Sequence, residues 1–161
     1  MNIIIIQQFN KDYYKEFYSE WLTSRSKYKK WQNLIGLSSI TLGILIYILS
    51  ETSKTFSYAM LFFGVYLFIE FYSTRKKWLT ARLDSKMLNK EVTLIFEEDS
   101  IKTKGPFVET IGKWDFYNDA IESEKGLFLV PENGVSIYIQ KKSFQNKNDI
   151  LEIIKKIKGE K

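Results

Sequence analysis

Three consecutive carboxylates, Glu97-Glu98-Asp99, form the densest group of residues that could bind a metal ion or transfer a proton. They lie between two apolar runs, and such a turn between predicted strands is the usual place for solvated acids. A metal site there would need further ligands from elsewhere in the chain. Asp115 and Asp119 are four residues apart, in a segment whose pattern decides for neither helix nor strand. Neither group indicates a catalytic site.

The chain of 161 residues contains no cysteine and no histidine. Their absence excludes disulfides, thiolate nucleophiles, Cys/His zinc sites and Ser-His-Asp triads. Gly105 and Gly134 are isolated turn glycines, and neither phosphate-binding pattern, GxxxxGK[ST] or GxGxxG, occurs. No nucleophile has an adjacent base in the sequence. We therefore predict a protein that is not an enzyme and that uses no cofactor or metal.

Basic residues gather beside two apolar segments. The net charge is +5, and the arithmetic by segment is +3 for residues 1–30, +4 for 75–91 and −1 for 92–161. One interpretation of these residues is that they fix the topology of a membrane segment. A second is that they attract anionic lipid headgroups, which would contribute about 1 kcal/mol per basic residue. Without a recognised module, they do not indicate nucleic-acid binding. The candidate membrane-surface contacts are Arg25, Lys27, Lys29, Lys30, Arg75, Lys76, Lys77 and Arg82.

The first apolar segment, Trp31 to Ser50, has 20 residues without a formal charge, and ten of them are Leu or Ile. A helix of this length spans about 30 Å, the thickness of a bilayer hydrocarbon core. The ten side chains favour insertion by about 3–6 kcal/mol in total. The segment therefore predicts a membrane-spanning helix, and the alternative is the core helix of a soluble domain.

The second apolar segment, Thr55 to Thr74, contains one charge, Glu70 near its end. A carboxylate at that depth reaches the interface, and the alternative is a buried contact to a partner helix. The joint Glu51-Thr52-Ser53-Lys54 is short, which predicts an antiparallel hairpin. The small residues Ser39, Gly43 and Gly64 would allow close helix contact.

The basic flanks lie on the two outer sides of the hairpin, so both termini are expected in the cytosol. The run Ile3 to Ile6 is too short for a signal peptide, and no basic residue precedes it. A strand is predicted over Asn2 to Phe9, followed by a helix from Lys11-Asp12 capped by Asn10 or Asp12.

An aromatic stripe marks that helix, because Tyr13, Phe17 and Trp21 recur every four residues. We expect the stripe to pack against the cytosolic domain or to lie at the membrane interface; alternatively, these three side chains face a partner. A second row, Tyr14, Tyr18 and Leu22, runs beside it.

From Glu91 onward, apolar and polar residues alternate with a period of two, which predicts strands. The expected strands cover 91–96, 101–104, 108–114, 119–124, 127–130 and 135–140, with turns at Gly105-Pro106 and Glu132-Asn133-Gly134. The final segment has Ile150, Ile153, Ile154 and Ile157 on one helical face, with Asn146 or Asn148 as cap. Trp114 is expected in the core. The pattern predicts an antiparallel sheet closed by a C-terminal helix.

The organisation thus has four parts: a cytosolic strand and amphipathic helix (1–30), a transmembrane hairpin (31–74), a basic juxtamembrane helix (75–90) and a cytosolic β domain (91–161). Because a domain of about 60 residues buries only about 60% of its surface, the N-terminal strand and helix are expected to pack onto the sheet.

Three stretches of the sheet domain carry a resemblance: Val92 to Ile101, Ile111-Gly-Lys-Trp114, and Ile139 to Phe144 with its Lys-x-x-Phe element. With the two apolar segments, they resemble the YcxB-like family of bacterial membrane proteins. The resemblance covers nearly the whole chain and implies an α+β fold, with a pleckstrin-homology-like (PH-like) sheet domain that binds or scaffolds.

The expected function is therefore that of a non-enzymatic protein of the bacterial inner membrane, whose PH-like domain binds or regulates a protein partner or a second copy of itself. The alternative is an immunity protein that neutralises a membrane-acting toxin or bacteriocin, with the hairpin as the contacting surface. The two hypotheses differ in which part of the chain carries the binding.

Overall fold

The computed structural model describes residues 2–50 and 54–159 and divides the chain into two compact units. One unit combines the chain up to Glu20 with the chain from Arg82 onward; we call it the sheet domain. The other, from Trp21 to Ala81, we call the helical hairpin. The chain therefore leaves the sheet domain after its first strand and helix and returns to it after the hairpin.

The first sheet of the sheet domain has four antiparallel strands in the order β1-β2-β3-β4. The strands are β1 Ile3–Gln8, β2 Glu91–Phe96, β3 Ser100–Lys104 and β4 Glu109–Lys113. Ile5 lies opposite Leu94, and both are fully buried, whereas the neighbouring pair Ile4 and Ile95 faces outward. The expected packing of the N-terminal strand onto the sheet is confirmed by this pairing.

The second sheet has three antiparallel strands, β5 Tyr117–Glu122, β6 Gly126–Pro131 and β7 Ile137–Gln140, in sequence order. The prediction of one sheet is wrong, because a 3-10 turn, Trp114–Phe116, separates β4 from β5. The Trp114 ring is buried against Phe96, and its Nε1 donates a hydrogen bond to the Glu97 carbonyl at 3.2 Å. Fixing this large side chain in the core turns the backbone out of the first sheet.

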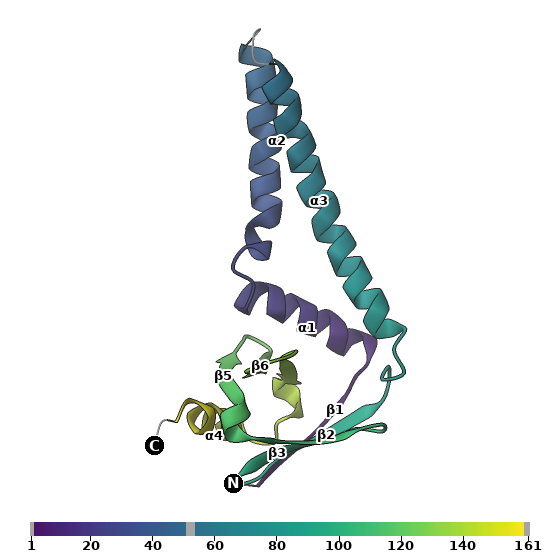
Figure 1. The fold of residues 1–161 in the computed structure, drawn as a ribbon, viewed down its shortest axis with the longest axis vertical. Helices are drawn as coiled ribbons and strands as arrows, with labels where there is room; N and C mark the ends of the chain where they lie inside the picture. The colour runs from purple at the N-terminus through teal and green to yellow at the C-terminus, as the bar shows by residue number, and fades with distance from the viewer. Residues whose placement is uncertain (1, 51–53, 160–161) are drawn as a thin grey trace. The chain divides into compact units, whose positions relative to one another are not determined.

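Helix α4, Lys147–Lys158, closes the core and packs on β5 (Figure 1). Its cap is Asn146, whose side-chain oxygen accepts a hydrogen bond from the Asn148 N–H at 3.0 Å. The helix ends at Gly159, which has the left-handed conformation that glycine adopts without strain. The buried core combines side chains from both sheets and α4, with Phe144 partly buried against it.

Helix α1, Lys11–Ser24, begins at Asn10, whose side chain accepts a hydrogen bond from the Tyr13 N–H at 2.8 Å. Asn10 rather than Asp12 is thus the cap. The Tyr13 ring stacks on Phe9 with centroids 4.6 Å apart and contacts Tyr138 of β7. These aromatic contacts attach the first part of α1 to the sheets.

The helical hairpin contains α2, Gln32–Leu49, and all but the last two residues of α3, Lys54–Leu83, and the two helices lie side by side (Figure 1). A 3-10 turn, Lys29–Trp31, precedes α2. Both helices are long and apolar enough to cross a membrane. The basic helix predicted over 75–90 is not a separate element, because α3 continues to Leu83 and turns follow it. Most of the predicted joint, 51–53, lies outside the described residues.

Close contact between α2 and α3 depends on small residues. A Cβ atom added to Gly64 would lie 2.5 Å from Ile40 Cγ1 and 2.7 Å from the Gly36 carbonyl oxygen. The Ser39 hydroxyl donates to the Met60 carbonyl at 2.9 Å, and the Ser57 hydroxyl donates to the Gly43 carbonyl at 2.7 Å. The expectation of close contact at Ser39, Gly43 and Gly64 is confirmed.

Glu70 joins the two helices of the hairpin. Its carboxylate accepts hydrogen bonds from the Gln32 side-chain amide of α2 and from the Thr74 hydroxyl one turn later, at 2.9 Å for Thr74. Lys29 approaches the same carboxylate at 3.4 Å. The carboxylate thus contacts the neighbouring helix but is not buried, since its side chain is 34% exposed, and its reach to the membrane interface stays a prediction.

Candidate binding site

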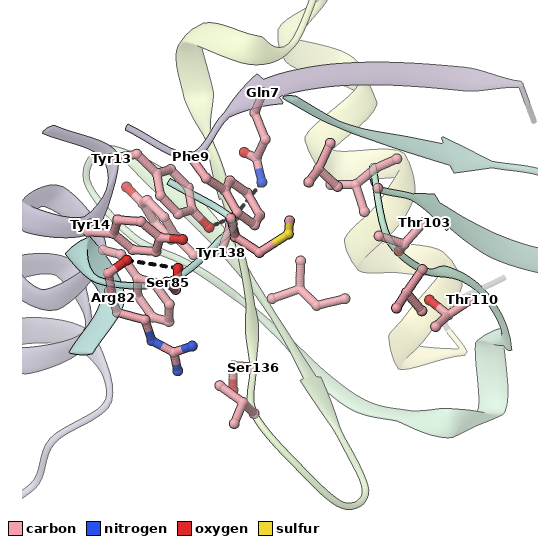
Figure 2. A pocket seen from close by; sticks show the side chains of 18 of the residues that line it. Gln7, Phe9, Tyr13, Tyr14, Arg82, Ser85, Thr103, Thr110, Ser136 and Tyr138 are labelled. Carbon is pink, nitrogen blue, oxygen red and sulfur yellow. Dashed lines mark hydrogen bonds between the residues drawn. The ribbon is translucent and has the colours of Figure 1, made fainter. Parts of the chain in front are cut away.

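The sheet domain contains a cavity of about 390 Å³ between its first sheet, α1 and the β6–β7 hairpin (Figure 2). We call it the inner cavity. Its walls combine residues from distant parts of the chain, and all of them belong to the sheet domain. The lining residues are Gln7, Phe9, Tyr13, Tyr14, Phe17, Arg82, Ser85, Met87, Val92, Leu94, Thr103, Gly105, Phe107, Val108, Thr110, Val135, Ser136, Ile137 and Tyr138.

Most of this wall is apolar, because the strands turn their inner face toward the cavity. Val92 and Leu94 are 3% and 0% exposed, and they alternate with the outward-facing Thr93. Phe107, Val108 and Val135 are more than half exposed, at 59%, 64% and 68%. The cavity therefore has a buried apolar floor and an exposed apolar rim.

One side of the cavity has its charged residue together with two hydroxyl groups. Figure 2 shows Tyr14, Arg82 and Ser85 together there, with Thr103 and Thr110 on the opposite side. The Ser85 hydroxyl donates to the Arg82 carbonyl at 2.9 Å. Burial raises the pKa of Tyr14, which keeps its hydroxyl protonated. Arg82 is the one charged residue among those that line the cavity.

A buried hydrogen-bond network forms another part of the wall. The Tyr13 hydroxyl and the Gln7 side-chain amide both donate to the Tyr138 carbonyl, each at 3.0 Å. Burial raises the pKa values of Tyr13 and Tyr138 far above the ordinary tyrosine value. These phenols therefore remain protonated at neutral pH and cannot serve as bases.

A second hollow, which we call the outer groove, runs beside β4 and has a volume of about 570 Å³. β4 is the last strand of its sheet, and Ile111 at its centre is 70% exposed. Phe116 is 43% exposed and Val135 of the opposite wall 68%. The remaining lining residues are Thr110, Gly112, Lys113, Asp115, Tyr117, Pro131, Asn133 and Ile137.

The acidic cluster has structural partners. Lys102 Nζ lies 2.6 Å from the Glu97 carboxylate and lowers the pKa of Glu97 by this hydrogen bond. Glu98 pairs with Lys156 at 3.3 Å. Within residues 2–50 and 54–159, no group of three or more His, Cys, Asp or Glu side chains could hold a metal ion. Asp119 accepts a hydrogen bond from the Ala120 N–H and approaches Lys158.

The predicted partner-facing stripe does not lie on one exposed face. Tyr13 is only 3% exposed, because its ring packs between Phe9 and Tyr138, so the partner-facing prediction is wrong for this residue. Phe17 is half-buried and stacks on Tyr138 with centroids 5.5 Å apart. Trp21 is half-buried and belongs to the helical hairpin. For Tyr13 and Phe17, packing against the domain is the interpretation that holds.

The predicted membrane-surface residues divide by exposure. Arg25, Lys29 and Arg82 are half-buried. Arg82 lines the inner cavity, whereas its charge and position in the sequence predicted only contact with the membrane surface. The exposed members of the set are Lys27, Lys30, Arg75, Lys76 and Lys77.

Comparison with known proteins gives no relative from which a function could be taken. The chain matches no protein-family model, no curated protein and no solved structure. The site is therefore interpreted from its own geometry.

Proposed function

We propose that the protein spans the bacterial inner membrane through α2 and α3, with both termini in the cytosol. In the most apolar stretch of α2, only 22% of the residues are buried within the protein. In the corresponding stretch of α3, the buried share is 17%. The core helix of a soluble protein would hide these side chains. A bilayer is the solvent that accepts two such helices, since a helix satisfies its own backbone hydrogen bonds.

The orientation is supported by the basic residues at the two outer ends of the hairpin. Lys27 and Lys30 are exposed before α2, and Arg75, Lys76 and Lys77 are exposed on the last part of α3. Positive residues next to a span remain on the cytosolic side. A reporter that functions only in the cytosol should be active when it is fused at Lys161, and a reporter that functions only outside the cytosol should be inactive there. The opposite result would contradict this topology.

The sheet domain, in this proposal, is a PH-like, non-enzymatic binding module of the YcxB-like kind. A four-strand sheet, a three-strand sheet and a C-terminal helix support this layout. Two expected landmarks support it as well, because Trp114 is buried in the core and Phe144 packs against it.

The function that this geometry supports best is binding of a protein partner along β4. The observation that carries it is the free edge of β4 beside the apolar outer groove. Natural edge strands are protected by charges, but the central Thr110-Ile111-Gly112 of β4 carries none. An extended segment of a partner could add as a further strand and place an apolar side chain in the groove.

The experiment compares two isoleucines that lie in the same cross-strand row. Ile111 is on the edge strand β4 and Ile4 on the opposite edge strand β1, joined through Ile95 and Lys102. Ile111→Lys should abolish capture of a partner by the full-length protein in cells, whereas Ile4→Lys should preserve it. Equal capture by both variants would contradict binding along β4.

Replacing residues 31–74 by unrelated membrane spans separates this function from toxin immunity. Partner capture should survive the replacement if the sheet domain carries the binding. Capture that is lost on replacement but survives Ile111→Lys would instead make the hairpin the contacting surface, as expected of an immunity protein.

A further inference from the structure

The inner cavity has a different chemistry from the outer groove, because its mostly apolar wall contains a single charged residue, Arg82, whereas the groove contains both Lys113 and Asp115. We propose that the inner cavity binds a single-chain anionic amphiphile, with the acyl chain along the apolar walls and the acidic group beside Arg82. This site goes beyond the proposed protein partner, because it lies between the sheets rather than along the free edge of β4.

The size and lining of the cavity fit such a ligand. Its volume of about 390 Å³ lies within the roughly 300–1,000 Å³ of small-molecule sites. Those sites are mostly apolar and contain a few polar groups that orient the ligand. Here Val92, Leu94 and Ile137 supply apolar wall, and the exposed rim leaves a way in. A flexible acyl chain could follow this irregular wall between strands and helix.

Charge complementarity defines the polar end of the ligand. Arg82 carries the one charge in the lining, and no carboxylate is part of the wall. Its guanidinium group has the donor geometry that carboxylates and phosphates accept. The side chains of Tyr14 and Ser85 lie on the same side (Figure 2), and the Ser85 hydroxyl donates to the Arg82 carbonyl. A neutral or cationic head group would lose the attraction to the Arg82 charge.

The chain connection to α3 supplies the source of the ligand. Arg82 follows Thr74, the end of the expected membrane span, by eight residues of continuous helix. Eight residues of α-helix extend about 12 Å. The cavity wall and the expected span are thus joined by a short length of chain, and fatty acids or lysophospholipids of that membrane are the proposed source of the ligand.

Two pairs of variants test the body and the polar end separately. Thr103 lies on the inner face of β3 opposite Leu94, so Thr103→Phe would fill the cavity. Thr93→Phe is its control, because Thr93 is on the outer face of the same sheet. Arg82→Gln removes the charge of the lining. Lys86→Gln removes an exposed charge four residues further along the chain, at a position that does not line the cavity.

The experiment uses the full-length protein in phosphatidylcholine nanodiscs, with a photoreactive palmitate analogue as probe. Crosslinked peptides should include the cavity walls, residues 103–110 or 135–138. Unlabelled palmitate or lysophosphatidylglycerol should compete, whereas hexadecanol, which has the chain but no charge, should compete poorly. The stronger of the two anionic competitors identifies a carboxylate or a phosphate source.

Thr103→Phe should remove the cavity crosslinks, and Thr93→Phe should retain them. Arg82→Gln should weaken palmitate competition about tenfold, the effect of losing one hydrogen bond to a charged group, whereas Lys86→Gln should not. Thermal unfolding identifies any variant that fails to fold, and the competition measurements on the wild-type protein test the proposal without a variant.

Crosslinks confined to α2 and α3, or hexadecanol competing as well as palmitate, would overturn the proposal. So would unchanged cavity crosslinks in folded Thr103→Phe. These outcomes leave partner binding along β4 unaffected, because that function is tested through Ile111, which does not line the inner cavity.

Discussion

The side-chain amide of Gln7 in β1 donates a hydrogen bond to the main-chain carbonyl of Tyr138 in β7, 3.0 Å away. Its other side-chain atom, Oε1, accepts a longer hydrogen bond from the Gln140 N–H at 3.4 Å. β1 and β7 belong to different sheets. A single buried glutamine thus connects the first strand of the chain to the last and borders the inner cavity.

Replacing Gln7 by Leu should lower the free energy of unfolding by about 1–3 kcal/mol, because a buried polar group loses a partner. The Tyr13 hydroxyl donates to the same Tyr138 carbonyl. The double variant Gln7→Leu/Tyr13→Phe removes both donors to this carbonyl. Its loss of unfolding free energy should therefore exceed the sum of the losses in the two single variants. Urea unfolding of the full-length protein in detergent would measure this coupling.

The neighbouring Gln8→Leu provides the control for this bridge. Gln8 lies on the exposed side of β1, and its amide reaches the Asn89 carbonyl only at 3.5 Å. Its replacement should change stability by a few tenths of a kcal/mol, as most surface substitutions do. If Gln8→Leu were as destabilising as Gln7→Leu, the bridge between the sheets would not explain the effect.

The buried tyrosines predict a loss of stability in alkali. Burial, reinforced by the Glu16 carboxylate that accepts the Tyr138 hydroxyl at 2.8 Å, raises the pKa of Tyr138 above its ordinary value. A raised pKa in the folded state contributes stability below the unfolded pKa of about 10, and this stability is lost as the pH rises further. The protein should therefore unfold more readily above about pH 10.

Tyr13→Phe should make this alkaline loss less steep, because burial likewise raises the pKa of Tyr13 and the variant has one fewer such group. Tyrosinate absorbance followed together with helix content would test the linkage. Ionisation of all ten tyrosines before any loss of helix content would contradict it.

Gly126 at the start of β6 is predicted to tolerate no side chain. A Cβ atom there would lie 2.3 Å from Tyr138 Cε2 and 2.5 Å from the Ile139 carbonyl oxygen. Gly126→Ala should therefore destabilise by about 1–3 kcal/mol or more through overpacking. At Gly112 of β4 the nearest atoms are 3.5 Å away in the Tyr117 ring, which is ordinary contact. Gly112→Ala should be nearly neutral in the same unfolding experiment.

The local patterns of the sequence predicted most helices and strands because each depends on nearby residues. The alternation of Val92, Leu94 and Phe96 gave the inner face of β2, and the uncharged run from Trp31 gave the extent of α2. The two-sheet arrangement could not be predicted in this way. It depends on where Trp114 packs against Phe96, a contact between residues in different strands and turns.

The two hollows were also beyond prediction from local pattern. The inner cavity combines Gln7, Arg82 and Val135, which come together only through the pairing of β1 with β2 and the return of the chain after the hairpin. The charge of Arg82 indicated membrane topology but not its place in a wall. Likewise, the exposure of Ile111 follows from the end position of β4 in the sheet order.

The last prediction concerns the hairpin. Gly64→Val should force α2 and α3 apart, because even one Cβ atom at this position would lie 2.5 Å from Ile40 Cγ1. The main-chain carbonyl oxygen of Gly36 is nearly as close, at 2.7 Å, so side-chain rotation alone cannot relieve the clash. In a membrane, close approach of small residues is a principal source of helix association. The variant should thus loosen the hairpin rather than merely repack it.

Since the natural chain has no cysteine, spin labels can be attached at cysteines introduced for Leu37 of α2 and Phe63 of α3, both exposed. Gly64→Val should lengthen and broaden the distance distribution between them in nanodiscs. Ala59→Val adds the same kind of bulk at an exposed position of α3 and should leave the distribution unchanged. A distribution unaltered by Gly64→Val would show that contact at this glycine does not hold the helices together.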